Sequence, residues 1–150
     1  MYQPPDPASY FSLVWEIVEQ IPEGYVASYG QIASMIPPPE GVDPEQYDRL
    51  AARWVGSAMN AVKDRTIPWQ RVINSQGKIS FPKGSSSAEQ QRALLEMEGV
   101  EFDDQEKVDF EVVGWDGPPD DWLRSHGLMH PRSLKKKRKS QNSDSQPSLF

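Results

Sequence analysis

The stretch Pro68-Trp69-Gln70-Arg71 brings an indole ring, an amide and a guanidinium together on a segment that is predicted to form a tight loop. The indole of Trp69 can offer a large, rigid, apolar wall to a ligand. It cannot act as a nucleophile, because the lone pair of its nitrogen belongs to the ring. The chain contains no cysteine, which excludes a thiolate nucleophile, disulfides and thiolate metal sites. These residues therefore predict a binding surface and not a covalent reaction centre.

Three helices are expected to precede this loop. An aspartate followed by a proline, at residues 6–7 and again at 43–44, is typical of a helix start. Ser28, with Gln31 three residues later, has the pattern of a capping box. Apolar residues at helical spacing follow these starts. The expected helices span residues 7–20, 29–35 and 44–62.

The third of these helices has an apolar stripe and a basic side. Leu50, Val55, Ala58, Met59 and Val62 form the stripe. A short helix followed by one with small and basic exposed residues favours a helix-turn-helix, in which glycine and serine let the backbone approach a phosphate chain. An ordinary amphipathic surface helix is the alternative. The polar side holds Arg49, Arg53, Gly56, Ser57, Asn60 and Lys63.

After the loop the pattern changes to a small hairpin and a fourth helix. The turn-forming residues 74–77 separate two short extended runs, 71–73 and 78–81, which predicts the hairpin. A helix is then expected to start near Ser86 and to end at Gly99. Its inward-facing residues are expected to be Leu94, Leu95 and Met97.

The rest of the chain is predicted to add little to the core. Residues 100–115 have the composition of two weak edge strands, and Trp122 and Leu123 are expected to pack back on the fold. From residue 131 the chain is polar and basic, which predicts disorder. A chain of 150 residues has room for one core. We therefore expect a mostly α fold with a small β-hairpin, a winged helix-turn-helix-like DNA-binding domain over residues 1–130, and a disordered basic tail over 131–150.

Charge is unevenly distributed along the sequence. The net charge is -6 at pH 7, yet residues 49–92 carry eight Lys or Arg and only two Asp or Glu. A basic block in an acidic frame predicts an anion-binding face, with ordinary solvated charge as the alternative. The first residues lack a signal-peptide pattern, and nowhere do 18 apolar residues run together. We expect a monomeric cytoplasmic protein, associated with the nucleoid, that does not bind membranes.

Four blocks of sequence, in order, resemble the motifs of the C-terminal domain of the O6-alkylguanine-DNA alkyltransferases. In that family the third block reads Pro-Cys-His-Arg, and its cysteine accepts the alkyl group. Here Trp69 occupies the cysteine position and Gln70 the histidine position. The resemblance covers roughly residues 8–115 and is to the alkyltransferase-like branch, which binds alkylated guanine without removing the alkyl group. The blocks are Gly24–Ala33, Ala52–Met59, Ile67–Ile73 and Leu95–Val100.

The resemblance implies roles for matching residues. Arg53 matches an arginine that enters the duplex where the extruded nucleotide had been, and Tyr29 matches a tyrosine that pushes the phosphate and helps the nucleotide rotate. Glu98 and Arg71 match members of a buried hydrogen-bond network, in which Glu98 is expected to face Gln70. The implied DNA-binding residues are Tyr29, Arg49, Arg53, Gly56, Ser57 and Asn60, the last of which lies near an asparagine hinge of the family.

The same resemblance implies a pocket for a flipped base. An aromatic wall such as Trp69 contributes on the order of 1 to 3 kcal/mol to base binding. On the far wall, Pro82, Lys83 and Gly84 stand where the family carries a tyrosine and a serine ahead of a glycine, which predicts a wider pocket that tolerates bulky O6 adducts. Lys83 either hydrogen-bonds the base or its phosphate or is solvated. The implied pocket residues are Tyr29, Trp69, Gln70, Pro82, Lys83 and Gly84.

Together these features predict a non-enzymatic DNA-damage recognition protein. It is expected to bind O6-alkylguanine in duplex DNA through the minor groove, to flip the nucleotide, and to mark the lesion for repair such as nucleotide excision repair. A winged-helix regulator that reads sequence and a residual enzyme acting on alkyl lesions are the alternatives. No cofactor is expected. His126 and His130 are four residues apart, but Gly127 and Pro131 disfavour a helix there, so no metal site is predicted.

The end of the chain carries a second signal. The last five residues, Gln146 to Phe150, resemble the Gln-x-Ser/Asp-Leu-Phe motif by which bacterial proteins dock on the replication sliding clamp. Gln146, Leu149 and Phe150 are the residues expected to make that contact. The basic run 135–139 is expected to add nonspecific phosphate contacts and a steeper salt dependence.

Overall fold

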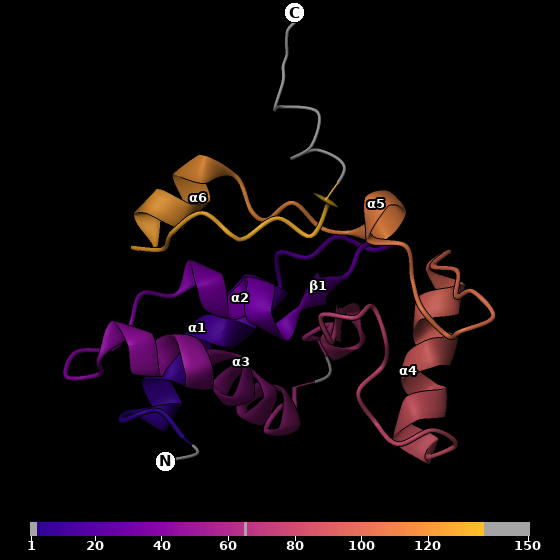
Figure 1. The fold of residues 1–150 in the computed structure, drawn as a ribbon, viewed down its shortest axis with the longest axis horizontal. Helices are drawn as coiled ribbons and strands as arrows, with labels where there is room; N and C mark the ends of the chain where they lie inside the picture. Colours follow the sequence, from indigo (N-terminus) through magenta and orange to yellow (C-terminus); the bar gives the residue numbers. More distant parts are fainter. Residues whose placement is uncertain (1–2, 65, 137–150) are drawn as a thin grey trace, which may run out of the picture.

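The computed structural model describes residues 3–64 and 66–136, and within them the fold is mostly helical, as predicted. Helices α1, α2 and α3 form one half of the molecule, and α4 stands apart from them in the other half (Figure 1). No helix in these two ranges is both long and apolar enough to cross a membrane. The elements are α1 (Pro7–Val18), β1 (Ala27–Ser28), α2 (Tyr29–Met35), α3 (Pro44–Asn60), η1 (Trp69–Arg71), β2 (Val72–Ile73), α4 (Ser86–Met97), α5 (Phe110–Val113) and α6 (Asp120–Ser125).

Side-chain caps set the starts of the first three helices, where the sequence predicts them. The carboxylates of Asp6 and Asp43 each accept a hydrogen bond from a backbone N–H three residues later, at 3.3 Å. Ser28 Oγ accepts from the N–H of Gln31 at 3.0 Å. Gln31 does not complete the capping box, because its side-chain amide donates to the carbonyl of Trp115 at 2.7 Å. That bond ties α2 to the C-terminal part of the chain.

A parallel pair of strands stands where the sequence predicts a hairpin. Strand β1 pairs with β2, so that Ala27 lies opposite Val72. The predicted turn does form, with the N–H of Asn74 donating to the carbonyl of Lys78 at 3.0 Å. Asn74 Oδ1 also accepts from the N–H of Lys78 at 3.0 Å, which closes the turn on itself. Residues 78–81 therefore form no strand, and the hairpin prediction is wrong.

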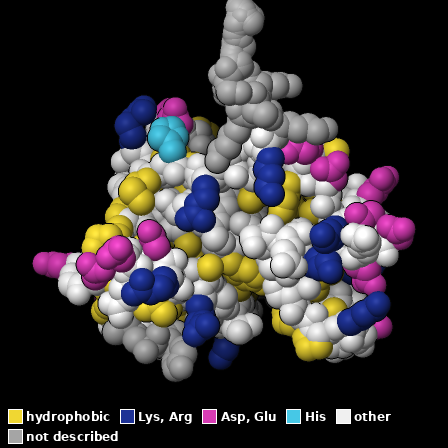
Figure 2. All heavy atoms as spheres, viewed as in Figure 1, with side chains coloured by type: hydrophobic (Ala, Val, Ile, Leu, Met, Phe, Trp, Pro, Cys, Tyr) yellow, Lys and Arg dark blue, Asp and Glu magenta, His cyan; other side chains and the backbone are white. Residues whose placement is uncertain are grey.

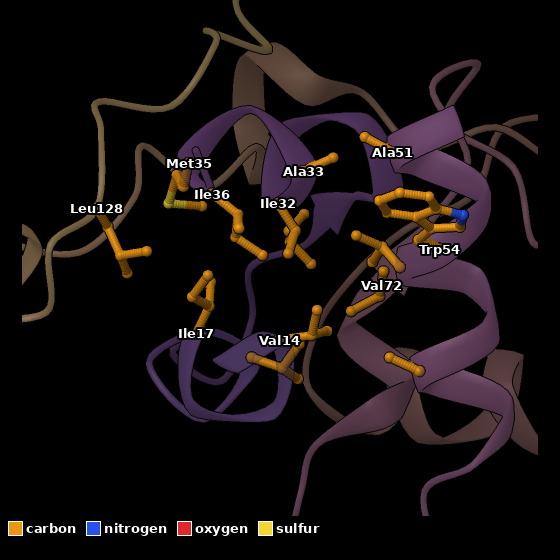
Figure 3. Close-up of a cluster of buried hydrophobic side chains, with 14 of the residues drawn as sticks. Val14, Ile17, Ile32, Ala33, Met35, Ile36, Ala51, Trp54, Val72 and Leu128 are labelled. Carbon is orange, nitrogen blue, oxygen red and sulfur yellow. The ribbon is translucent and has the colours of Figure 1, made fainter. Parts of the chain in front are cut away.

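The main core lies between α1, α2 and α3. Trp54 of α3 is fully buried against Val14 of α1 and Ile32 of α2 (Figure 3). Tyr10 and Tyr47 pack their rings against Trp54, with centroid distances of 5.6 and 5.7 Å. The apolar stripe of α3 is thereby held inward, which leaves the polar side of that helix facing outward.

A second, smaller core lies under α4, and it corrects one prediction for that helix. Leu95 is fully buried, as expected, and Leu94 is half-buried, but the side chain of Met97 is 82% exposed. Met97 is the last residue of α4, and Gly99, with φ at 91°, turns the chain away just beyond it. Met97 therefore lies past the buried face. The core residues are Val26, Ile73, Leu95, Val100 and Val108.

The two edge strands predicted within residues 100–115 are absent from the structure. A single bridge joins Val26 to Gly114, and the short helix α5 precedes it. The N–H of Val26 donates to the carbonyl of Val113 at 2.9 Å, and the N–H of Trp115 donates back to Val26 at 2.9 Å. These two bonds use the backbone N–H and C=O of Val26, and the pairing is limited to this one bridge.

The C-terminal residues pack back over α2, as predicted for Trp122 and Leu123, of which Leu123 is buried in the main core. The N–H of Met129 donates to the carbonyl of Met35 at 2.8 Å, and that of Arg132 donates to Ser34 Oγ at 2.9 Å. The start of the predicted tail is therefore held against α2 at residue 132 (Figure 1). Residues 137–150, with the end of the basic run and the clamp-like motif, lie outside the described residues.

Candidate nucleic-acid interface

A cavity of about 440 Å³ opens between α3, the start of α2 and the segments around Trp69 and Pro82. Tyr29 enters it from the first residue of α2, directly after β1. Trp69 enters it from the first residue of η1, which leads directly into β2. The pairing of β1 with β2 therefore brings these two rings to one space. The cavity is lined by Tyr29, Ala52, Arg53, Gly56, Ser57, Met59, Asn60, Trp69, Val72, Ser80, Phe81, Pro82 and Gln91.

Two groups of sequence-predicted residues meet at this cavity. From the predicted pocket come Tyr29, Trp69 and Pro82, and from the polar side of α3 come Arg53, Gly56, Ser57 and Asn60. Arg49 is exposed one turn earlier on α3 and lies outside the cavity. Half of the predicted pocket residues and most of the predicted DNA-binding residues of α3 thus line the same cavity.

The charge on this face suits a polyanion. Acidic side chains gather toward the two edges of the face, and the charged side chains in its middle are Lys and Arg, which also occur at the edges (Figure 2). Exposed hydrophobic side chains lie in a hollow between the half with α2 and α3 and the half with α4 (Figure 2). A Cβ atom built on Gly56 would meet nothing within 4 Å, so the surface of α3 is open at that point. A negatively charged backbone can approach here while an apolar group is buried beside it.

Trp69 is a wall of the cavity and not a core residue. The backbone N–H of Trp69 donates to the carbonyl of Ile67 at 2.7 Å. The backbone N–H of Arg71 donates to the carbonyl of Pro68 at 3.0 Å, which closes the 3-10 turn of η1. Ile67 is buried and anchors the turn. The indole is half-buried and stands edge-on to Phe81, with ring centroids 6.2 Å apart.

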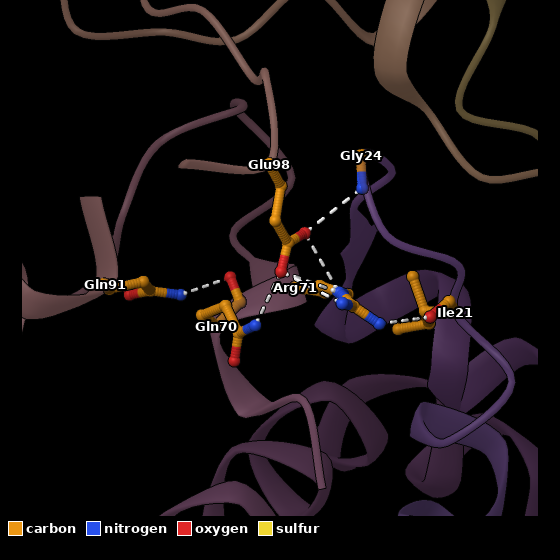
Figure 4. Close-up of polar contacts among 6 residues, drawn as sticks. All are labelled: Ile21, Gly24, Gln70, Arg71, Gln91 and Glu98. Atoms are coloured by element: carbon orange, nitrogen blue, oxygen red, sulfur yellow. Dashed lines mark hydrogen bonds and ion pairs between the residues drawn. The ribbon is translucent and has the colours of Figure 1, made fainter. Parts of the chain in front are cut away.

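A carboxylate fixes the segment that carries Trp69 (Figure 4). Glu98 Oε2 accepts from Gln70 Nε2 at 2.8 Å and from Arg71 Nη2 at 3.0 Å. Glu98 Oε1 accepts from the N–H of Gly24 at 3.1 Å and from Arg71 Nε at 3.0 Å. Arg71 also donates from Nη1 to the carbonyl of Ile21 at 2.8 Å. The contact expected between Glu98 and Gln70 is therefore present. The Glu98–Arg71 pair also ties the segment of Gln70 to the backbone between α1 and β1, through Gly24 and Ile21.

The protonation state of Glu98 follows from these partners. Burial alone would raise the pKa of this carboxyl, but the hydrogen bonds from Arg71, Gly24 and Gln70, with the charge of Arg71, outweigh it and hold the pKa below its ordinary value. Glu98 is ionised at neutral pH, so it accepts a hydrogen bond and the amide of Gln70 is the donor. An amide in that role cannot accept a proton from a neighbouring group.

The comparisons with known proteins agree with this geometry. Residues 9–100 match the family described as 6-O-methylguanine DNA methyltransferase, DNA binding domain. The chain is an alkyltransferase-like member of this family. Alkyltransferase-like protein 1 of Schizosaccharomyces pombe is 39% identical over 94 residues, which are 62% of this chain and 78% of that protein. A DNA base-flipping protein of Escherichia coli K12 is 36% identical over 108 residues, 71% of this chain and 74% of that protein.

Solved structures place the alkyltransferase-like fold beside DNA. The crystal structure of S. pombe Atl1 in complex with damaged DNA containing O6-carboxymethylguanine is 32% identical and has a TM-score of 0.54. A second crystal structure, of S. pombe ATL in complex with DNA, is 30% identical and has a TM-score of 0.55. In both cases the match covers 75% of this chain and 97% of the other.

Three residues of the predicted pocket lie elsewhere in this alkyltransferase-like protein. Lys83 and Gly84 line a second cavity, of about 650 Å³, instead of the first. Lys83 Nζ lies 3.1 Å from Glu106 Oε2, because the acidic segment that follows α4 passes beside its loop. Gln70 lines a third cavity, of about 620 Å³, that adjoins the other side of Trp69. None of the three lines the first cavity, so their contact with a bound base stays a prediction.

Phe81 and Gln91 are among the cavity residues that the sequence pattern does not reveal as site residues. Phe81 borders both the first and the second cavity. Gln91 on α4 is 2% exposed and donates from Nε2 to the carbonyls of Gln70 and Val72, each at 3.0 Å. Gln91 precedes Leu95 by one helical turn and so shares its buried face, which is the signal that could have revealed it.

The two histidines have structural partners. His126 stacks on Trp122 with ring centroids 3.9 Å apart, and His130 Nδ1 lies 3.5 Å from an oxygen of Asp120. Across residues 3–64 and 66–136, no three His, Cys, Asp or Glu side chains gather in a way that could hold a metal ion.

Proposed function

We propose that this protein recognises O6-alkylguanine in duplex DNA by flipping the nucleotide into the 440 Å³ cavity, and that it leaves the alkyl group in place. The observation that carries the proposal is the wall of that cavity. Trp69 lines it, and the chain has no cysteine that could accept an alkyl group. The relatives support the proposal, since one is named a DNA base-flipping protein and another is bound to DNA containing O6-carboxymethylguanine.

Flipping requires a replacement for the extruded base as well as a pocket. Extrusion costs a few kcal/mol, and stacking on an aromatic ring returns on the order of 1 to 3 kcal/mol. Arg53 lies at the rim of the cavity on the outward side of α3, where a long cationic side chain can enter the minor groove and fill the gap. Tyr29, at the start of α2, lies where it can press on the rotating phosphate.

The absence of alkyl transfer follows from the residues at the turn. In our proposal Trp69 takes the place of the acceptor and Gln70 the place of the base that would activate it. The lone pair of the indole nitrogen is part of the aromatic ring and cannot attack a carbon. The amide of Gln70 is occupied by Glu98 at 2.8 Å. A protein that holds a lesion without repairing it must pass it on, and nucleotide excision repair is the route we propose.

One experiment tests the central claim. The protein is titrated with a duplex containing O6-methylguanine and with its undamaged twin, and its mass is then measured. We expect tighter binding to the lesion and an unchanged protein mass. A mass gain of one methyl group, or recovery of unmodified guanine, would establish an enzyme. Discrimination among undamaged sequences that exceeds the preference for the lesion would establish a sequence-reading regulator.

The clamp contact is a separate proposal, which rests on the terminal motif alone. Gln146, Leu149 and Phe150 are proposed to dock on a sliding clamp and so bring the protein to replicating DNA. Removal of residues 146–150 should abolish binding to the clamp in a pull-down while lesion binding stays the same. Unchanged clamp binding by the truncated protein would refute this proposal.

A further inference from the structure

The amide of Gln91 has a fixed orientation. The side chain is 2% exposed, and its Nε2 donates to two backbone carbonyls, those of Gln70 and Val72, each at 3.0 Å. A carbonyl only accepts hydrogen bonds, so the nitrogen of the amide must face these two groups. The oxygen, Oε1, is therefore turned the other way (Figure 4).

Gln91 Oε1 has no hydrogen-bond partner among the residues that the structure describes. Among the described residues, the fully buried side-chain atoms without a hydrogen-bond partner belong to Gln31 and Trp54. Gln91 Oε1 is not one of them, so it retains some contact with solvent. Gln91 lines the 440 Å³ cavity, and Oε1 is the polar atom of this side chain that is left to meet a ligand there. A buried acceptor is costly to leave unpaired, and a ligand that brings a donor gains from meeting it.

The donor chemistry of the ligand is narrow. Alkylation at O6 fixes guanine in a form without a hydrogen on N1, and N9 carries the sugar. The exocyclic 2-amino group then holds the only N–H bonds of the base. Other polar groups of the cavity, such as the hydroxyls of Tyr29 and Ser57, can rotate to donate or to accept. The Gln91 oxygen can only accept.

We propose that Gln91 Oε1 accepts a hydrogen bond from the 2-amino group of the flipped O6-alkylguanine, and that Gln91 thereby selects the base. The inference rests on the proposed function and adds a specificity-determining residue to it. Bases without a 2-amino group would leave this acceptor unpaired. Gln91 thus has two tasks, since its nitrogen holds the turn that bears Trp69 and its oxygen reads the ligand.

Two lesions that differ only in this group separate the two tasks. Binding is measured for duplexes that carry either O6-methylguanine or O6-methylhypoxanthine, which lacks the 2-amino group, opposite dC. The proteins are the wild type, Gln91→Met, Gln91→Lys and Gln90→Met. Lysine retains a donor for the two carbonyls and removes the acceptor. Gln90 is the exposed neighbour and lies outside the cavity, which makes it the matched control.

For the wild type and Gln90→Met we expect a preference of about three- to tenfold for the lesion with the amino group. In Gln91→Met and Gln91→Lys this preference should fall by that factor, because the difference in base-pair strength between the duplexes is common to all four proteins. A merely structural role would weaken both lesions equally. Unchanged preference in both Gln91 variants would overturn the inference alone, and equal binding of lesion and undamaged DNA by the wild type would overturn the proposed function as well.

Discussion

Replacing Glu98 with glutamine, a side chain of nearly the same size and shape, should nevertheless destabilise the protein. Both carboxylate oxygens accept only from donors, namely the N–H of Gly24, the amide of Gln70 and the guanidinium of Arg71. In Glu98→Gln an NH2 group must face at least one of them. The side chains of Arg71 and Glu98 are only 17% and 10% exposed, so the guanidinium loses its partner in a mostly buried place.

The magnitude follows from that burial. Removing one partner of a fully buried pair costs about 3 to 5 kcal/mol. The partial exposure of this pair and the one oxygen that glutamine keeps lower the expected cost to about 2 to 3 kcal/mol. For a domain of this size such a loss lowers the Tm by about 10 °C.

Urea unfolding followed by tryptophan fluorescence measures the effect, since the chain has five tryptophans. The control is Glu96→Gln, the same substitution two residues earlier, where the carboxylate pairs with Arg92 at 3.1 Å but is 52% exposed. Its expected cost is about 0.5 kcal/mol or less.

The cost of Glu98→Gln should also depend on pH. The pKa of Glu98 is lowered in the folded protein, so its contribution to the free energy of unfolding is complete above the unfolded-state pKa of about 4.3 and is lost as the pH falls through the lower folded value. The difference between the wild type and the variant should therefore shrink in acid. A cost no greater than that of Glu96→Gln, or a difference that is the same at pH 7 and pH 3, would contradict the assigned role.

Three further predictions concern DNA binding. Arg53→Ala should weaken binding to O6-methylguanine DNA by on the order of tenfold, whereas Arg49→Ala, outside the cavity, should weaken lesion and undamaged DNA alike; equal effects of both would remove Arg53 from its role. Trp69→Ala should cost about five- to a hundredfold in lesion affinity in the same titration, and full affinity would exclude stacking on the indole. A larger O6 adduct should bind about as well as methyl, because the family's tyrosine is missing near Pro82, and a strong preference for methyl would refute this.

Local chemistry accounts for what the sequence predicts correctly. The cap of α2 depends on Ser28 and a backbone N–H three residues later, so neighbouring residues determine it. The turn at Asn74 is equally local, but the partner of β2 is not, since β1 lies far earlier in the chain and no short-range pattern indicates it. Local patterns therefore predict a hairpin where the structure has a parallel pair.

The candidate site divides along the same line. The residues of α3 that reach the cavity share one helical face, which their spacing reveals. Lys83 lies in a loop, and its place depends on Glu106, which belongs to a distant segment. Gln91 is a polar residue on a buried face, and its partners are backbone carbonyls that carry no sequence signature.

The pairing of β1 with β2 also bears on the speed of recognition. Because a backbone ladder holds the segments of Tyr29 and Trp69 together, the cavity exists before DNA arrives. A preformed cavity lowers the cost of ordering the protein, so we expect the opening of the base pair to limit the rate of binding. A damaged base opens more readily than an intact one, so the association rate itself should distinguish lesions by how weakly they pair. The two short strands should thus make the association rate, before any contact with Gln91, depend on the strength of the target base pair.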